Sequence, residues 1–361
     1  MNNHWSPLKI IVLVLCLSLA AQAQQAPVHV GSTPTTVVRG KIPANLPPAA
    51  RVKPGQTVVI DTLSHQGMSS AVGPVEFFAK GGIKSGDVLK DAVDVYGKIE
   101  PATGVSGHVL TGPIYVEGAE PGDQLEVRIM DIQFRVPYGV NSTNKGTGVL
   151  PDLLSEPSSK IIHLDLQRKV ALFASGIEVP LAPFMGVMAV APPPPSDGSV
   201  VSSRPPGSFG GNLDLKQLTK GATLYLPVYN TGAQFFTGDA HGIQGDGEVD
   251  GTAIEMSLSP TVKFVVNKGK GKDMAFPRAE TATHYIAIGM DKDLNLAMKN
   301  AVQEAVNFLM KEKGLSSADA YSLASIGVDF RVAESVNLVQ VVYGMIPKSL
   351  FKTNQPYWYK P

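Results

Sequence analysis

Cysteine is almost absent from this sequence, which has a single one, Cys16, in 361 residues. Cys16 lies in an apolar run over residues 10–20, which follows Lys9 and precedes Ala21-Gln22-Ala23. A short basic segment, an apolar stretch too short to span a bilayer and an Ala-x-Ala site are typical of a cleaved secretory signal. We therefore expect a signal peptide over residues 1–23, and a mature chain that can use neither a disulfide nor a thiol nucleophile.

Lipid attachment at Cys16 is the competing interpretation of this N-terminus. A lipoprotein signal needs small residues just before its cysteine, whereas Val14 and Leu15 precede Cys16 here. Cleavage after residue 23 therefore fits better. It predicts export to the periplasm or the medium, with no membrane contact once the signal is removed.

Charged residues are also scarce, at 17% of the chain, and the 31 Lys and Arg residues equal the 31 Asp and Glu residues in number. No run of basic residues breaks this balance. Without a net positive field, we expect no nucleic-acid partner. The hydrophobic share of 43% indicates instead a globular protein with a large core.

Glycine (36) and proline (28) are frequent and spread along the chain, which is typical of many turns and short strands. In residues 124–132 the apolar side chains alternate until Met130, where the phase shifts; such alternation indicates a half-buried strand. Four glycine turns precede runs of this kind: Gly55-Gln56 before residues 57–60, Gly86-Asp87 before a weaker run, Gly122-Asp123 before residues 125–129 and Gly221-Ala222 before residues 223–226. We predict a mainly β fold, whose β-sandwich or barrel-like body spans residues 24–290.

The last part of the chain changes to helical spacing. Seven apolar residues recur on one helix face: Leu294, Met298, Ala301, Val302, Ala305, Phe308 and Leu309. Gly314 is typical of a helix end, and Ser316 of the start of a second helix. Strands should follow over residues 327–332 and 336–346. We predict that residues 291–361 form a C-terminal, helix-containing α+β element packed on the β body.

Two irregular stretches interrupt the predicted strands. Residues 191–198 contain four consecutive prolines, which remove four hydrogen-bond donors and exclude a central strand. Residues 204–212 begin with Arg204-Pro205-Pro206 and end with Gly-Gly-Asn. Both stretches could border a pocket or simply connect strands at the surface.

The residues that could carry chemistry gather in residues 236–255, which hold five acids, one histidine and five glycines. Asp239 and His241 are two positions apart, so in a strand they would point to the same side and could bind one metal ion. Glu255 would point away from the apolar Ile254. From the spacing alone, a solvated Gly-Asp loop is as good an interpretation as a functional site.

Two histidines outside this segment have open roles. His108 could be a metal ligand, a proton carrier or a hydrogen-bonded structural residue, and the same alternatives hold for His65, which follows a predicted strand. The sequence has no Gly-x-Ser-x-Gly elbow, no phosphate-binding Gly-Lys-Ser/Thr loop and no recognisable Ser-Ser-Lys arrangement. If the chain cleaves an amide, a metal-activated water therefore fits its residues best.

Three blocks resemble the acetamidase/formamidase family, within a region from about Val52 to Leu350. The blocks are GHVLTGPIYVEGAEPGD at residues 107–123, GGNLD at residues 210–214, and GDAHGIQGDGE with GTAIE over residues 238–255, the last being the most specific. The resemblance implies hydrolysis of short linear amides to a carboxylate and ammonia. It also implies a divalent metal ion, zinc or alternatively calcium, a β-sandwich joined to an α+β portion, and a homo-oligomer, either a dimer or a tetramer.

The resemblance also implies which residues form the site. The implied metal ligands are Asp239 and His241, the implied catalytic residues are Glu255 as general base with Asp246 and His108, and the implied substrate-binding residues are Asn212, Asp214, Glu117 and Gln244. Two features depart from the family: Asp250 stands where many members have cysteine, and the signal peptide is unusual. Both leave the substrate more open than the reaction.

Two other functions are compatible with these residues: an esterase-type hydrolase that uses the same metal and water, and an exported metal- or ligand-binding protein without turnover. A binding protein needs no base beside its metal. The presence of Asp239, His241 and Glu255 together therefore favours an enzyme.

Overall fold

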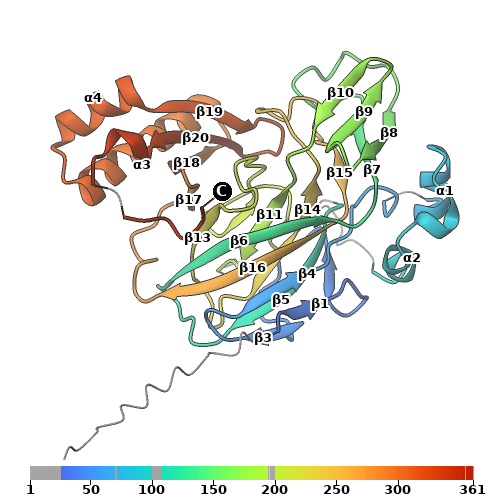
Figure 1. Ribbon diagram of the computed structural model, residues 1–361, viewed down its shortest axis with the longest axis horizontal. Helices are drawn as coiled ribbons and strands as arrows, with labels where there is room; N and C mark the ends of the chain where they lie inside the picture. Colours follow the sequence, from blue (N-terminus) through green and yellow to red (C-terminus); the bar gives the residue numbers. More distant parts are fainter. Residues whose placement is uncertain are drawn as a thin grey trace, which may run out of the picture.

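The computed structural model describes residues 26–69, 71–99, 107–193, 195, 200–353 and 355–360. The predicted signal peptide, residues 1–23, lies outside the described residues. Within them the chain folds mainly into two large β-sheets, with the helices gathered at the margins (Figure 1). The predicted fold, mainly β with an α+β portion, is confirmed.

The first sheet has nine strands among the described residues and is mostly antiparallel. Its order is β1 (Val28–Val30), β4 (Thr57–Ile60), β16 (Leu258–Asn267), β6 (Gln124–Phe134), β13 (Thr223–Pro227), β17 (Arg278–Glu280), β18 (His284–Asp291), β20 (Gln340–Pro347) and β19 (Asp329–Glu334). On β6 the register slips, so that Thr261 of β16 faces Asp131 while Val262 faces Ile129. Met130 is thus the extra residue of a β-bulge, which explains the phase shift in the sequence.

The second sheet, of eleven strands in the described part of the chain, carries the central hairpins. Its main path is β10 (Ile177–Pro180), β9 (Val170–Ala174), β8 (Ser158–Asp165), β7 (Tyr138–Thr143), β15 (Glu255–Met256), β14 (Phe235–His241), β11 (Phe184–Val190) and β12 (Gly210–Asn212). From β14 it branches to β5 (Val109–Val116), which pairs with β2 (Val37–Arg39) and β3 (Ala50–Val52). The strand β14 therefore lies deep inside the sheet, and all seven of its residues are buried.

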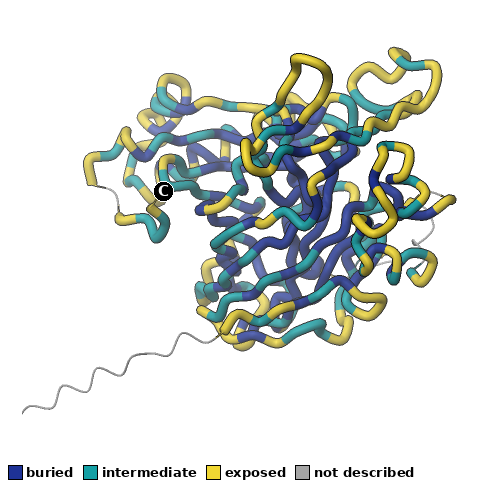
Figure 2. The backbone as a smooth tube through the Cα atoms, turned by 45° about the vertical axis from the view of Figure 1, so that its right-hand side comes forward, coloured by how far each residue is buried: buried dark blue, intermediate teal, exposed yellow. Residues whose placement is uncertain are grey.

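The two sheets pack face to face around one main core. Phe235 of β14 and Phe264 of β16, which belong to different sheets, stack edge to face with ring centroids 5.1 Å apart. The backbone between the sheets is buried and the exposed segments lie at the periphery (Figure 2). Burial of these apolar faces supplies the main driving force for folding.

Two short helices inside the β body were not foreseen. The helices α1 (Gly73–Ala79) and α2 (Lys90–Val95) flank a 3-10 turn, η1 (Ser85–Asp87). The prediction of a weak strand after Gly86-Asp87 was therefore wrong. Packing overrides the local pattern here: Phe78 of α1 stacks on Tyr138 at 4.9 Å, and Arg135 holds Asp91 of α2 at 2.6 Å.

The C-terminal helices agree with the sequence. The helix α3 (Leu294–Lys313) begins at Asp293, whose side chain accepts hydrogen bonds from two backbone N–H groups, and ends at Gly314 with φ 70°. The helix α4 (Ser317–Gly327) is capped by Ser316. No described helix is both long and apolar enough to span a membrane.

The strands that follow these helices extend the nine-stranded sheet. The strand β20 begins at Gln340 and not at the expected residue 336, because a turn with Leu338 at φ 72° comes first. A short 3-10 turn, η2 (Lys348–Leu350), follows β20. The strand β18 spans the predicted domain boundary at residues 290 and 291 and pairs with both β17 and β20, so one sheet continues across that boundary.

Candidate metal centre and active site

The centre of the site is built by β14 and β15. Asp239 and His241 lie on β14, and Glu255 of β15 is the direct antiparallel partner of His241. The Nε2 atom of His241 lies 3.5 Å from Asp239 Oδ2 and 3.2 Å from Glu255 Oε1. The two-residue spacing of Asp239 and His241 thus places both side chains in one buried cluster, as strand geometry predicts.

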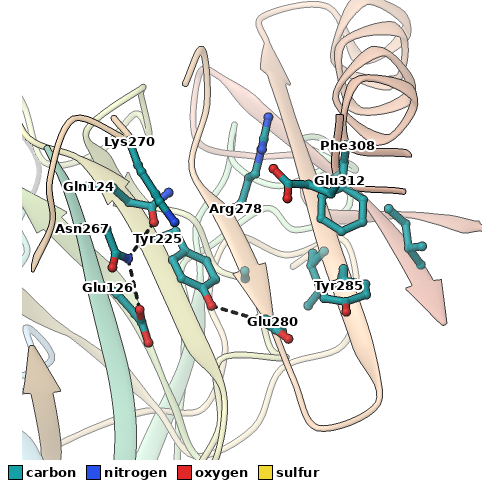
Figure 3. Close-up of a pocket in the computed structure, with 14 residues that line it drawn as sticks. Gln124, Glu126, Tyr225, Asn267, Lys270, Arg278, Glu280, Tyr285, Phe308 and Glu312 are labelled. Carbon is teal, nitrogen blue, oxygen red and sulfur yellow. Dashed lines mark hydrogen bonds between the residues drawn. The ribbon is translucent and has the colours of Figure 1, made fainter. Parts of the chain in front are cut away.

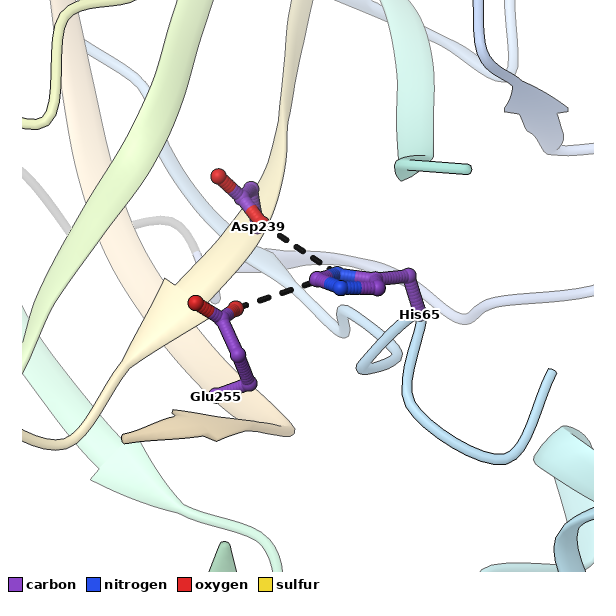
Figure 4. Close-up of side chains that lie close together, drawn as sticks. All are labelled: His65, Asp239 and Glu255. Atoms are coloured by element: carbon purple, nitrogen blue, oxygen red, sulfur yellow. Dashed lines mark ion pairs between the residues drawn. The ribbon is translucent and has the colours of Figure 1, made fainter. Parts of the chain in front are cut away.

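Two further histidines reach Asp239 from other parts of the chain. His65, which follows β4, has its Nδ1 atom 3.4 Å from Asp239 Oδ1 and 3.8 Å from Glu255 Oε2 (Figure 4). His108, which precedes β5, has its Nε2 atom 3.8 Å from Asp239 Oδ2. Its Nδ1 atom lies 3.2 Å from the hydroxyl of Ser203. Asp239 therefore lies between three imidazoles.

A second group of acids lies on the far side of His241. The Nδ1 atom of His241 is 3.9 Å from Asp214 Oδ1. The amide of Asn337 donates to Asp214 Oδ2 at 2.7 Å and to Glu248 Oε2 at 3.3 Å. Asn337 is itself held in place because Glu334 accepts its backbone N–H at 3.0 Å.

These residues form two groups with the composition of metal sites. One consists of His65, Asp239 and Glu255, the other of Asp214, His241 and Glu248, and in each the candidate ligand atoms lie within 4.8 Å of one another. Several of these atoms are buried without a hydrogen-bond partner within the described part of the chain: His65 Nδ1, Asp214 Oδ1, Asp239 Oδ1, His241 Nδ1 and Nε2, and Glu255 Oε2. Buried polar atoms are normally satisfied, so these unpaired atoms fit a bound cation.

The backbone around the site is shaped for close approach. Asp214, Asp239 and Glu248 all have positive φ angles, 44°, 51° and 44°. Left-handed conformations are uncommon for these residues and cluster at functional sites. Gly186 of β11 lies against two of the site carboxylates. A Cβ atom at this position would be 2.5 Å from Asp214 Oδ1 and 2.8 Å from Asp239 Oδ2.

The charges of the cluster perturb one another. Burial would raise the pKa of Asp239, but the imidazoles that face it, those of His108 and His241 first, hold it well below its usual range. Burial raises the pKa of Asp214 well above its usual range, and burial together with the charge of Asp214 does the same for the pKa of Glu248. Such opposed shifts among adjacent carboxylates are typical of active sites.

Most of the predicted site residues line or support one cavity of about 300 Å³. His108, Asn212, Asp214, Asp239 and Glu255 line it. His241 lies 3.5 Å from Asp239, and Gln244 donates to the backbone oxygen of Asp214 at 3.0 Å. The structure therefore brings together seven of the nine predicted residues.

The other two predicted residues lie elsewhere. Asp246 accepts a hydrogen bond from the Tyr343 hydroxyl at 2.8 Å and pairs with Lys216 at 2.9 Å, away from the cavity. Glu117 is exposed just beyond the end of β5. Their side chains do not reach the cluster, so we leave both out of the proposed site.

Among the cavity residues that the sequence did not place in the site are His65, whose role was left open, and Glu248, Arg204 and Asn337. Glu248 lies in residues 236–255 and Arg204 in residues 204–212, two segments that were already noted in the sequence. His65 and Asn337 come from distant strand ends, and no local spacing connects them to Asp239. Only the sheet order brings them together.

A second cavity, of about 350 Å³, lies between the nine-stranded sheet and α3 (Figure 3). Two of its three described acids are already paired: Glu280 accepts from the Tyr225 hydroxyl at 2.8 Å, and Glu126 accepts from Asn267 at 3.1 Å. Neither candidate ligand group in the described chain involves its residues. The cavity around Asp239 is therefore the better candidate for catalysis.

Comparison with known proteins agrees with this choice. The model of the Acetamidase/Formamidase family matches residues 37–196 and 199–353. The chain belongs to the acetamidase/formamidase family. The predicted family is thereby confirmed, and with it the enzyme class, an amide hydrolase.

Individual members of the acetamidase/formamidase family are similar over most of their length. The chain is 28% identical to a formamidase from Methylophilus methylotrophus, over 77% of this chain and 80% of that one. It is 25% identical to an acetamidase from Mycolicibacterium smegmatis, over 77% of this chain and 82% of that one. A crystal structure of an acetamidase from Bacillus halodurans superposes with a TM-score of 0.74 at 27% identity, covering 90% of this chain and 99% of that one.

Proposed function

We propose that this family member is an exported, metal-dependent amidase that hydrolyses short linear amides to a carboxylate and ammonia. The observation that carries the proposal is the pair of buried histidine–carboxylate groups at one cavity, where several ligand atoms lack a hydrogen-bond partner among the described residues. The family match and the relatives named formamidase and acetamidase support the substrate class.

The donor set fits a divalent cation, and zinc better than calcium. Imidazole nitrogen with carboxylate oxygen is a ligand combination of zinc, whereas calcium takes oxygen ligands. We assign Asp239 as the central ligand, with His65 and His241 beside it, and Asp214 with Glu248 as the second position. A bound divalent cation would polarise the amide carbonyl and lower the pKa of water.

Glu255 is the general base in this proposal. The backbone N–H of Ala253 donates to Glu255 Oε1 at 3.0 Å and fixes the carboxylate, while Oε2 accepts no hydrogen bond in the described chain. This oxygen takes the proton of the attacking water and returns it to the amide nitrogen as the C–N bond breaks. Ammonia and the carboxylate are the products.

His108 and Asn212 position the amide in this proposal. Burial lowers the pKa of His108, so its imidazole is neutral near pH 7 and can donate or accept a hydrogen bond. Asn212 lines the cavity, and its Oδ1 atom is buried without a hydrogen-bond partner among the described residues. It accepts a hydrogen bond from the N–H₂ group of the amide.

Export and assembly belong to the same proposal. The signal over residues 1–23 supports secretion, and the family resemblance supports a homo-oligomer. Detection of the mature chain in the periplasm or medium, beginning near Gln24, tests the first. Light scattering of the purified protein tests the second, and a monomer would contradict it.

Ammonia release tests the reaction. We expect the mature protein to release ammonia from formamide, acetamide or a slightly longer amide, to lose this activity with a chelator, and to regain it with zinc. The Asp239→Asn variant should be inactive, while the matched control Glu178→Gln, an exposed acid of β10, should be fully active. Chelator-resistant activity would refute the metal, and no ammonia from any folded, metal-loaded sample would refute the amidase.

A further inference from the structure

The cavity around Asp239 adjoins a second, larger chamber. The inner cavity measures about 300 Å³ and the outer chamber about 440 Å³. Six residues line both, so the two lie side by side: His65, Asn144, Arg204, Gly251, Thr252 and Asn337. A formamide or acetamide molecule would fill only part of the inner cavity, so the outer chamber has room for a longer substrate.

The wall of the outer chamber is polar and carries few charges. Hydroxyl and amide side chains dominate it: Gln66, Ser69, Ser142, Asn144, Thr147, Ser159 and Thr252. Asp250 is its one acid among the described residues, and one of its oxygens accepts the Thr252 backbone N–H at 3.1 Å. Such a wall suits a hydrated, polar group and offers little to an alkyl chain.

Arg204 is the single Lys or Arg side chain among the described residues that line either chamber. The loop holds it from both sides, because Ser203 contacts His108 and the following Pro205-Pro206 restricts the backbone. Its Nη2 atom donates to the backbone oxygen of Val336, on the outer wall, at 3.3 Å. The ion pairs of the described residues do not include its guanidinium, although its charge acts on the buried Glu334, and it has further N–H groups to donate.

We propose that Arg204 binds a carboxylate at the far end of the substrate, so that this amidase prefers linear amides that carry a remote carboxylate. This inference rests on the proposed function of the inner cavity. In the proposed function the amide end must reach Glu255 in the inner cavity, so the acid end stays beside Arg204. A guanidinium binds a carboxylate through two parallel hydrogen bonds, which gives both affinity and orientation.

Matched pairs of substrates test this inference. The anionic set consists of the monoamides of dicarboxylic acids with increasing chain length, and each has a neutral partner in which a methyl group replaces the carboxylate. We expect a higher kcat/KM for the anionic partner at the chain length that spans the two chambers. In Arg204→Met this preference should fall by about 10- to 100-fold, mainly through KM, with neutral amides changed by less than about threefold.

Further variants and conditions separate charge recognition from a structural role. Arg204→Lys should restore part of the preference, and added salt should weaken it in the wild type only. A merely structural Arg204 would lower kcat/KM equally for both members of each pair. That result, or a wild-type preference for the neutral partners, would overturn the inference while leaving the amidase intact.

A binding measurement keeps the two proposals distinguishable. If no amide of either set is hydrolysed, the proposed function fails. Calorimetric binding of glutarate to the metal-loaded protein then tests whether Arg204 binds a carboxylate. An affinity at least about tenfold lower in Arg204→Met would support carboxylate binding at this residue. Equal affinity in wild type and variant, with unchanged thermal unfolding, would overturn it.

Discussion

Replacing Gly186 with alanine perturbs the candidate metal site by a single methyl group. The new Cβ atom would lie 2.5 Å from Asp214 Oδ1, 2.8 Å from Asp239 Oδ2 and 2.8 Å from His241 Cε1. Contacts below 3.0 Å do not persist, so the Asp214 oxygen alone must move by about 0.5 Å, the difference between 2.5 Å and 3.0 Å. The variant therefore displaces ligands of both candidate groups without removing any of them.

The expected effect on the fold is small and the effect on function large. Alanine in a strand is favoured over glycine by about 0.5–1 kcal/mol, whereas overpacking costs about 1–3 kcal/mol. The free energy of unfolding should therefore fall by no more than about 2.5 kcal/mol. A misplacement of reacting groups on the order of 1 Å costs about 100-fold in rate, so we expect kcat to fall by roughly 10- to 100-fold.

The assay compares Gly186→Ala with Gly31→Ala, where a Cβ atom would meet nothing within 4 Å. Ammonia release, bound metal by elemental analysis and thermal unfolding are measured on both. We expect Gly31→Ala to match the wild type in all three, and Gly186→Ala to lose metal and activity while it unfolds cooperatively. Wild-type metal content and kcat in Gly186→Ala would refute the assignment of the ligands.

Three other outcomes follow from the structure. Asp246→Asn should keep kcat within about threefold of wild type, because the side chain of Asp246 contacts Tyr343 and Lys216 and not the cavity. A loss of activity as large as that of Asp239→Asn would show that Asp246 belongs to the active site. Removal of the metal should lower the melting temperature as well as the activity, because a metal ion bound only by the folded state stabilises that state. Equal melting temperatures of the apo and metal-loaded forms would contradict metal binding by the folded protein. Burial raises the pKa of Glu334 to about 7, above the value of an exposed glutamate. The folded state therefore keeps this proton to a higher pH than the unfolded state, and the free energy of unfolding should fall as pH rises from about 4.5 to 7. Denaturant melts of Glu334→Gln should show a weaker pH dependence in this range, and an unchanged pH dependence would contradict the assignment to Glu334.

The parts of the fold that depend on local patterns could be predicted from the sequence. Period-two alternation located β6 and showed a phase shift at Met130, where the structure has a bulge, because side-chain direction in a strand is set by sequence position alone. The spacing of α3 and its stop at Gly314 were equally local. The helices α1 and α2 were missed because their apolar faces are short and are stabilised by contacts with Tyr138 and Arg135.

In the candidate site, too, the residues that lie close together in the sequence could be predicted and the distant ones could not. Asp239, His241 and Glu255 lie on paired strands within one segment, so their proximity could be inferred. His65 and Asn337 reach the cluster only through the sheet order, which sequence spacing does not contain. Asp246 shows the opposite error: it stands in the same glycine-rich segment as Asp239, yet the turn directs its side chain to Tyr343.

The contact between the glycine-rich segment and the C-terminal strands couples catalysis to partial unfolding. Gly247 donates its N–H to the backbone oxygen of Ala333 at 3.0 Å, and its own oxygen accepts from the hydroxyl of Ser335 at 2.9 Å. These bonds join the two sheets next to Asn337, which holds Asp214 and Glu248 together. If β19 and β20 detach, one wall of the cavity leaves with them while the rest of the sandwich remains folded. Heat would then inactivate the enzyme before it denatures, and the working lifetime of the catalyst would be set by this one junction.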